Sequence, residues 1–163
     1  MYDHYSVMEH IAKTPLIGGD DEKLKRFFRA SNIREIEELF ENTSIAKTQG
    51  LIAMDDDDMK LGENADHNRN ARTYYSTILF KSYKKGDIPS WIEAKKWCRQ
   101  TARDLTDLLL LYKKKNIRGF AVNETIQDFT IFNIGQIFDF WAIQVSFSIQ
   151  EVYCPKNFSQ EYL

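Results

Sequence analysis

The first quarter of the chain shows the hydrophobic spacing of helices. In residues 5–13, apolar side chains recur at intervals of three or four positions, and Pro15 ends the pattern. Residues 20–28 begin with acidic side chains and then bring three apolar side chains together at helical spacing. A further helical stripe starts after Asn32, where Glu35 follows at the spacing of a capping box. We therefore predict a short N-terminal helix followed by a pair of helices.

After these helices the spacing changes to that of β-strands. Residues 44–54 and 72–83 read as strands, the second being rich in β-branched and aromatic side chains. They are predicted to form a hairpin whose connection, about residues 55–71, is a long acidic loop. Toward the end of the chain, apolar and polar side chains alternate over residues 141–150, which is typical of a half-buried antiparallel strand. Residues 126–134 are predicted to be a second strand beside it.

The longest predicted helix, about residues 90–115, lies between the two strand regions. Ser90 and Glu93 stand at the spacing of a capping box at its start. Its apolar stripe comprises Trp91, Cys98, Ala102, Leu105, Leu109 and Tyr112. The helix can bury this stripe only by lying across the sheet. Residues 1–163 are thus predicted to form a single α+β domain: an antiparallel or mixed sheet of four to five strands, a long helix packed across it, and N-terminal helices.

The overall charge and the cysteine content narrow the classes of function. The formal net charge is −2, which disfavours dedicated or sequence-specific nucleic-acid binding. The two cysteines form no CxxC pair and have no histidine at zinc-ligand spacing, so a disulfide-free cytoplasmic protein is expected. No apolar run is long enough to span a bilayer, and no membrane association is expected.

Enzyme signatures are missing from the sequence. It contains no GxGxxG, Walker loop, nucleophile elbow or HExxH motif. The three histidines are scattered and are expected at the surface. Cys98 falls on the buried stripe of the long helix, where burial suppresses thiol reactivity, and Cys154 is also expected to be inert. We therefore predict no catalytic residue and no cofactor.

An acidic run stands in the predicted loop. It consists of Asp55, Asp56, Asp57 and Asp58. Carboxylate oxygens are the ligands that Ca²⁺ and Mg²⁺ prefer. With Asp57 as first ligand, however, Met59 and Leu61 would occupy ligand positions without offering a side-chain oxygen. The run is therefore interpreted as a solvated loop or as a contact surface for a partner, and no metal site is predicted.

Two other segments are candidate subunit contacts. Lys95, Arg99 and Arg103 form a basic face on the long helix, which is either a solvated surface or a surface that meets the acidic loop of a neighbouring copy. Contact between two different patches generates closed rings when the rotation permits. The polar tail, residues 154–163, carries Phe158 and Tyr162 at spacings that an extended arm could present to a neighbour.

Several segments together resemble the small tail-terminator or tail-completion proteins of tailed bacteriophages and the cap proteins of contractile injection systems. They are residues 27–44, 51–58, 78–83, 95–115 and 139–153. The resemblance implies a homo-oligomeric ring, commonly hexameric, that caps the tail tube and sheath or joins the tail to the head, and that has no active site. It also implies a location in the bacterial host cytoplasm during assembly and in the particle afterwards. The acidic insert departs from a minimal version of such a protein.

Two other classes of function stay open. A small cytosolic adaptor that binds other proteins would share the same composition and would be monomeric. A metal-dependent hydrolase would use the four aspartates of the acidic run, and it would lose both metal and activity when they are replaced.

Overall fold

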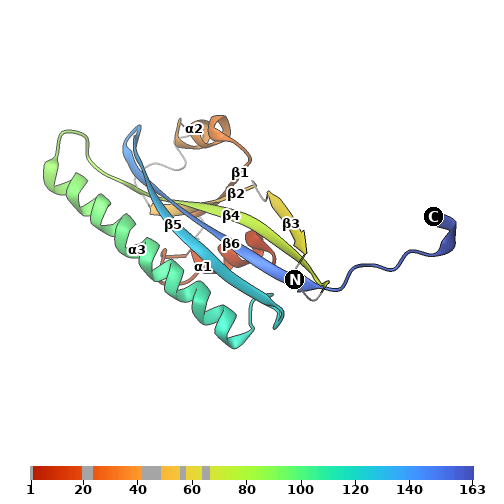
Figure 1. The fold of residues 1–163 in the computed structure, drawn as a ribbon. Helices are drawn as coiled ribbons and strands as arrows, with labels where there is room; N and C mark the ends of the chain where they lie inside the picture. The colour runs from red at the N-terminus through yellow and green to blue at the C-terminus, as the bar shows by residue number, and fades with distance from the viewer. Residues whose placement is uncertain (1, 20–23, 42–48, 56–57, 64–66) are drawn as a thin grey trace.

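The computed structural model describes residues 2–19, 24–41, 49–55, 58–63 and 67–163. Its elements follow the order α1 (His4–Ala12), β1 (Phe27–Ala30), α2 (Ile33–Glu41), β2 (Gln49–Met54), β3 (Met59–Glu63), β4 (Arg69–Ser82), α3 (Ile88–Lys115), β5 (Glu124–Ile137), β6 (Phe140–Tyr153) and a single 3-10 turn, η2 (Gln160–Tyr162). Figure 1 shows one twisted sheet with the long helix α3 lying across it. The α+β class predicted from the sequence is confirmed.

Among the described residues the sheet has six strands, which is more than the four to five predicted. The strand order is β1-β2-β4-β6-β5, and β3 pairs with β4. The sheet is mixed, because β1 runs parallel to β2 whereas the other pairs are antiparallel. β5 and β6 form a hairpin that is interrupted by two bulges in β5. β5 therefore ends the sheet on one side.

The predicted helix over residues 20–28 is wrong at its C-terminal end, which is strand β1. Phe27 packs with α1 on one face of the sheet, and Phe28 packs with α2 on the other. Two adjacent large side chains can be buried in opposite cores only when the backbone is extended, because successive side chains of a strand point to opposite faces. The first part of the predicted helix, residues 20–23, lies outside the described residues.

The predicted long loop over residues 55–71 is also wrong. β2 and β3 both pair with β4: residues 49–53 lie opposite residues 77–81, and β3 lies opposite residues 69–73. Two short strands therefore share one long neighbour, and the acidic run begins in the interruption between them. All five residues of β3 are exposed, so neither face of this strand gives the alternating signal on which the prediction depends.

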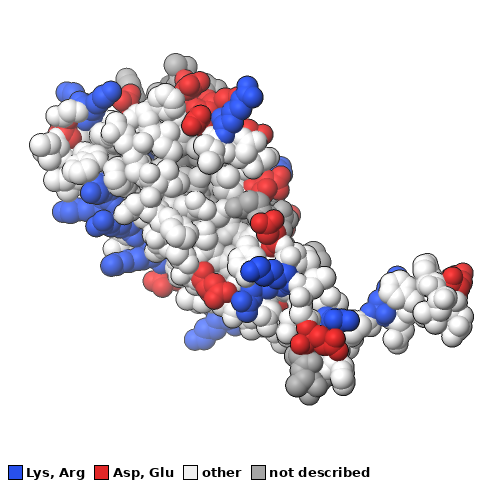
Figure 2. Space-filling view, turned by 45° about the horizontal axis from the view of Figure 1, so that its top comes forward, with Lys and Arg blue, Asp and Glu red and all other residues white. Residues whose placement is uncertain are grey.

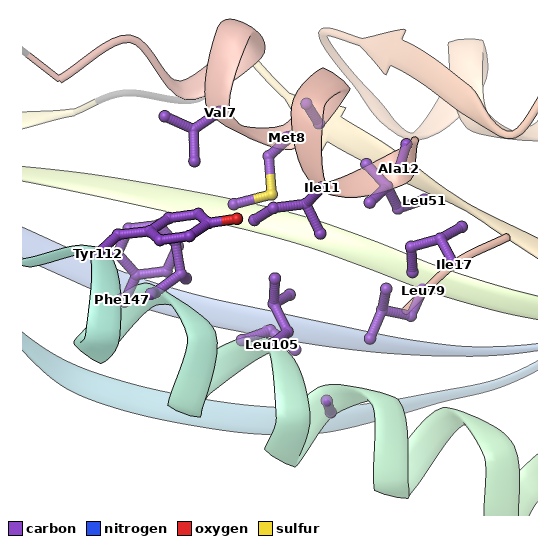
Figure 3. Packing of buried hydrophobic residues seen from close by; sticks show 14 of the residues in the cluster. Val7, Met8, Ile11, Ala12, Ile17, Leu51, Leu79, Leu105, Tyr112 and Phe147 are labelled. Carbon is purple, nitrogen blue, oxygen red and sulfur yellow. The ribbon is translucent and has the colours of Figure 1, made fainter. Parts of the chain in front are cut away.

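Each face of the sheet carries a separate core. On one face, α1 and α3 pack over β2, β4 and β6, and Figure 3 shows Ile11 of α1 and Leu105 of α3 among the buried side chains there. On the other face, α2 covers one end of the sheet through Phe40, whose ring centroid lies 5.1 Å from that of Phe80 and 4.9 Å from that of Phe140. The predicted burial of the α3 stripe is confirmed for all its members except Trp91, which is half-buried.

Helix caps fix where α2 and α3 begin. The N–H of Glu35 donates to Asn32 Oδ1 at 3.0 Å, which confirms Asn32 as the predicted cap of α2. The Glu35 carboxylate accepts in return from the N–H of Ser31, whereas a capping box would use the N–H of Asn32. The predicted start of α3 at Ser90 is wrong. Asp87 is the N-cap, and its carboxylate accepts from the N–H of Ser90 at 3.3 Å. None of the described helices is long and apolar enough to cross a membrane.

Candidate assembly surfaces

The acidic run interrupts a sheet edge. Asp55 continues from β2, and its N–H donates to the carbonyl of Ala30 in β1 at 2.9 Å. The carbonyl of Asp58 accepts from the N–H of Tyr74 in β4 at 2.9 Å. Both aspartate side chains are exposed, whereas Asp56 and Asp57 lie outside the described residues. The backbone at the two described ends of the run is therefore tied into the sheet while their carboxylates face solvent.

A cation and a phenol stand next to Asp55. The Arg29 guanidinium lies 3.6 Å from the ring centroid of Tyr5, which is the distance of a cation–π contact. Burial raises the pKa of the Tyr5 phenol to about 12; the Asp55 carboxylate acts in the same direction, and Arg29 opposes it. Tyr5, Asp55 and the nearby His4 also line a cavity of about 310 Å³. Asp55 thus belongs to a cluster that joins α1, β1 and the end of β2.

No metal site is formed by the part of the chain that the structure describes. Within those residues, no three His, Cys, Asp or Glu side chains lie close enough together to hold an ion. His67 and Glu63, which follow the acidic run in the sequence, contact each other at 3.3 Å between Nδ1 and Oε1. Neither joins a third ligand among the described residues.

The basic face of α3 divides into two parts. The Lys95 ammonium lies 4.2 Å from the Trp91 ring centroid and 5.0 Å from that of Trp141, so it serves to pack the start of α3 on β6. Arg99 and Arg103 are exposed. Figure 2 shows Lys and Arg side chains along the left margin of the view, over α3. Of the three predicted basic contacts, the two arginines are the ones that a partner can reach.

The acidic and basic patches are not brought together within one copy. α3 lies against β4, β6 and β5, whereas Asp55 and Asp58 lie beside β2 and β3 on the other side of β4. An electrostatic contact between the two patches would therefore have to join two copies of the chain. The predicted heterologous contact is compatible with this arrangement and stays a prediction.

The C-terminal arm, residues 154–163, leaves the body of the protein. Figure 1 shows it extending beyond the sheet from the end of β6. Every residue of the arm is exposed, with 57% of the surface of Phe158 and 69% of that of Tyr162 open to solvent. The two rings contact each other, with centroids 5.2 Å apart. The arm thus presents apolar side chains that its own domain does not cover.

The outer edge of β5 is a surface that the sequence interpretation did not identify. Residues 129–138 contain no charged side chain. Within this segment Ile131, Phe132, Ile134 and Phe138 are exposed, Phe132 to 51% of its surface. No described strand pairs with this edge. Figure 2 shows a broad face without charge between the basic margin and the acidic side chains.

A hollow of about 380 Å³ lies on the sheet beside this edge. Tyr74, Phe132, Ser76, Ser146 and Asp128 are among the residues that line it. The Asp128 carboxylate is already engaged, because it lies 3.4 Å from the Arg72 guanidinium and accepts from the Ser148 hydroxyl at 2.9 Å. The hollow therefore offers hydroxyls and four aromatic side chains, those of Tyr74, Tyr75, Phe132 and Phe147, and its carboxylate is already paired.

The prediction that all histidines lie at the surface is wrong for His4. This side chain is buried: Tyr2 donates to its Nδ1 at 2.9 Å, and its Nε2 donates to the Ser76 carbonyl at 2.8 Å. Its ring also stacks on Tyr75, with centroids 5.0 Å apart. These bonds hold α1 on β4, which gives the histidine a structural role.

The two cysteines differ in environment. Cys98 is buried, as predicted, and burial raises the pKa of its thiol to about 12, although Lys81 acts in the opposite direction. Its S–H donates to the Trp141 carbonyl at 3.5 Å. Cys154 is exposed at the base of the arm. Cys98 is therefore part of the packing. Cys154 was also expected to be inert, but its exposure leaves its thiol open to reagents, so that expectation is not supported.

Comparison with known proteins returns no family model that matches this sequence and no curated protein that matches it.

Proposed function

We propose that this protein is a non-catalytic structural subunit that assembles with copies of itself into a ring. In keeping with the sequence resemblance, the ring would terminate or cap a phage tail or a contractile injection particle, or join a tail to a head. Tail tube, sheath or connector proteins would be its other partners. The subunit would occupy the host cytoplasm during assembly and the particle afterwards.

One observation carries the proposal: the arm. A terminal segment that carries Phe158 and Tyr162 yet covers none of its own domain gains nothing for the stability of the isolated chain. Aromatic side chains on an extended segment gain favourable free energy only when a partner supplies an apolar surface. Arms that reach a neighbouring copy at a different patch make heterologous contacts, and such contacts close into rings when the rotation permits.

The mass of the protein in solution tests the proposal. Size-exclusion chromatography with light scattering should give a multiple of the 19.2 kDa chain mass, and electron microscopy of that fraction should show closed rings. A chain without residues 157–163 should have an unchanged circular dichroism spectrum and should lose the oligomer. A full-length chain that stays monomeric at about 100 μM, a concentration at which contacts of micromolar affinity would form, contradicts the proposal.

The hollow beside Phe132 favours a second candidate, a monomeric adaptor that binds another protein. A surface with four aromatic side chains and several hydroxyls is suited to a side chain of a partner. For this candidate, light scattering should give the mass of one chain with or without the arm. Closed rings of the isolated chain would exclude it.

A further inference from the structure

The outer edge of β5 has the properties of a strand that is covered in the working protein. Exposed edge strands normally carry lysine, proline or inward-pointing charges, which prevent pairing with other chains. Residues 129–138 carry none of these and expose four large apolar side chains. The two bulges bend the edge locally, but they leave residues 130–133 in regular pairing with β6. The outward N–H and C=O groups of that stretch are available to a further strand.

The arm has the properties of a strand that could pair with the outer edge of β5. Residues 155–159 form no helix or strand in the structure and extend away from the domain, whereas Cys154 at the base of the arm donates to Asn68 Oδ1 at 3.7 Å. Little structure therefore has to be broken before the arm binds. From Lys156 onward every residue has an N–H to donate, and eight residues span about 26 Å as a strand. That length matches most of residues 129–138. The single turn η2 is closed by backbone bonds from Tyr162 and Leu163 only and can extend at small cost.

The side chains of the two segments are also compatible. The arm carries only Lys156 and Glu161 as charges, and β5 presents no like charge against them over residues 129–138. Phe158 and Tyr162 are four residues apart, so in a strand they point to the same face. Phe132 lines the hollow beside this edge, and a register that puts Phe158 and Tyr162 on the same face as Phe132 lets an aromatic ring of the added strand pack against it.

From these observations we infer that the arm, residues 154–163, of one copy adds as a strand to the outer edge of β5 in a second copy. This inference rests on the proposed self-assembly and names its contact. The arm leaves from the end of β6, next to the start of β5, so it could lie along the β5 edge of its own chain only by reversing direction at Cys154. A heterologous contact, arm to edge, follows, and each copy keeps its own arm free for the next.

Disulfide trapping between full-length chains tests the inference. Both chains carry Cys154→Ser; one also carries Ser159→Cys in the arm, and the other, with a larger tag, carries Asn133→Cys on β5. Buried Cys98 does not interfere. Mild oxidation should produce the mixed disulfide about tenfold faster than in a matched mixture with Lys60→Cys on the exposed strand β3. Equal trapping in the two mixtures, or none, overturns the inference.

A second substitution checks that the apolar edge is what binds. Adding Phe132→Asp to the β5 chain should lower trapping about tenfold, because a charge replaces a central apolar contact. Leu61→Asp, an equally drastic change at an exposed position of β3, should leave trapping unchanged. The same trapping rate with either substitution would show that the β5 edge does not bind the arm.

Light scattering on the same chains separates this inference from the proposed function. If rings form but the disulfide at residue 133 forms no faster than the one at residue 60, the ring proposal stands and the contact of the arm with β5 is refuted. Preferred trapping in pairs or open chains, without rings, supports the contact and contradicts the ring. A full-length single chain that traps its own residues 133 and 159 within one molecule shows that the arm folds back and overturns the intermolecular contact.

Discussion

Replacing Leu105 by alanine tests how α3 packs on the sheet. Leu105 is fully buried among side chains of α1, β4 and β6 (Figure 3). The change removes three carbon atoms, worth about 0.8 kcal/mol each in transfer free energy, or roughly 2.4 kcal/mol. The cavity left behind adds to this, and measured Leu→Ala costs run from about 2.7 to 5.0 kcal/mol. Because the surrounding side chains are held on strands, little collapse is expected, and we predict a loss of about 3–4 kcal/mol.

Urea unfolding followed by circular dichroism measures this loss. The midpoint should fall while the slope with denaturant stays constant, because the unfolded chain exposes the same surface. The melting temperature should fall by roughly 6–16 °C, at about 2–4 °C per kcal/mol for a chain of this size. Leu110→Ala is the matched control on the same helix, since 43% of that side chain is exposed; its effect should stay within about 0.5 kcal/mol. Equal midpoints for the two variants would refute the packing described for α3.

Three further predictions concern charge and titration. Replacing all four residues from Asp55 to Asp58 by asparagine should leave the chain folded, with only a small fall in the urea midpoint from the loss of the Asp55 charge beside Tyr5 and Arg29. Self-association should become weaker and less dependent on salt, because exposed charges act over about 8–10 Å. Normal association of this variant at low salt would exclude the run as a contact. At pH 8 a thiol reagent should label Cys154 and leave Cys98 unlabelled until urea is added. The reason is that burial raises the pKa of the Cys98 thiol to about 12. Rapid labelling of both thiols in the folded protein would contradict this prediction. The pKa of Tyr5 is raised in the folded state, so the Tyr5 phenol of the unfolded chain loses its proton at a lower pH. The free energy of unfolding should therefore decline as pH rises from about 10 to 12, and Tyr5→Phe should reduce that decline. Urea titrations that give the same pH profile for both chains would show that the pKa of Tyr5 is not raised.

The parts of the fold that were predicted correctly are those with a strong local pattern. The stripe of α3 repeats over about six turns, from Trp91 to Tyr112, so the presence of this helix was clear from the sequence. Its N-cap was placed at Ser90, three residues after the observed N-cap Asp87, because both side chains can cap a helix and only the folded geometry shows which one accepts the bond.

The parts that were predicted wrongly depend on contacts distant in sequence. Phe27 and Phe28 fit a helical stripe locally, and only pairing with β2 makes them a strand. β3 exposes every side chain, and it is held by backbone pairing with β4 and by exposed contacts such as the ion pair of Glu63 with Arg69. Neither kind of contact leaves a trace in the hydrophobic pattern. His4 is polar by type, and its burial follows from hydrogen bonds to β4, more than seventy residues away.

Of the candidate surfaces, the sequence identified the arm and missed the edge of β5. The exposed arm with Phe158 and Tyr162 lies where the sequence placed it, at the end of the last strand. The β5 edge was readable as a run of ten residues without charge, but its two bulges broke the alternation of polar and apolar positions, so the segment was taken only as an irregular partner of β6. Which strand lies at an edge depends on the strand order, and a pattern within one segment does not reveal that order.

The division of one edge of β4 between two short strands gives the sheet two zones of different protection. Residues 77–81 pair with β2 under both cores, and their amide hydrogens should exchange with solvent only on global unfolding. Residues 69–73 pair with the wholly exposed strand β3, and this zone should open by local fluctuation. The last pair of β6 joins Tyr153 to Arg69 in the same zone. The arm therefore leaves the sheet beside the zone that we expect to open first, and its base should gain mobility while both cores stay closed.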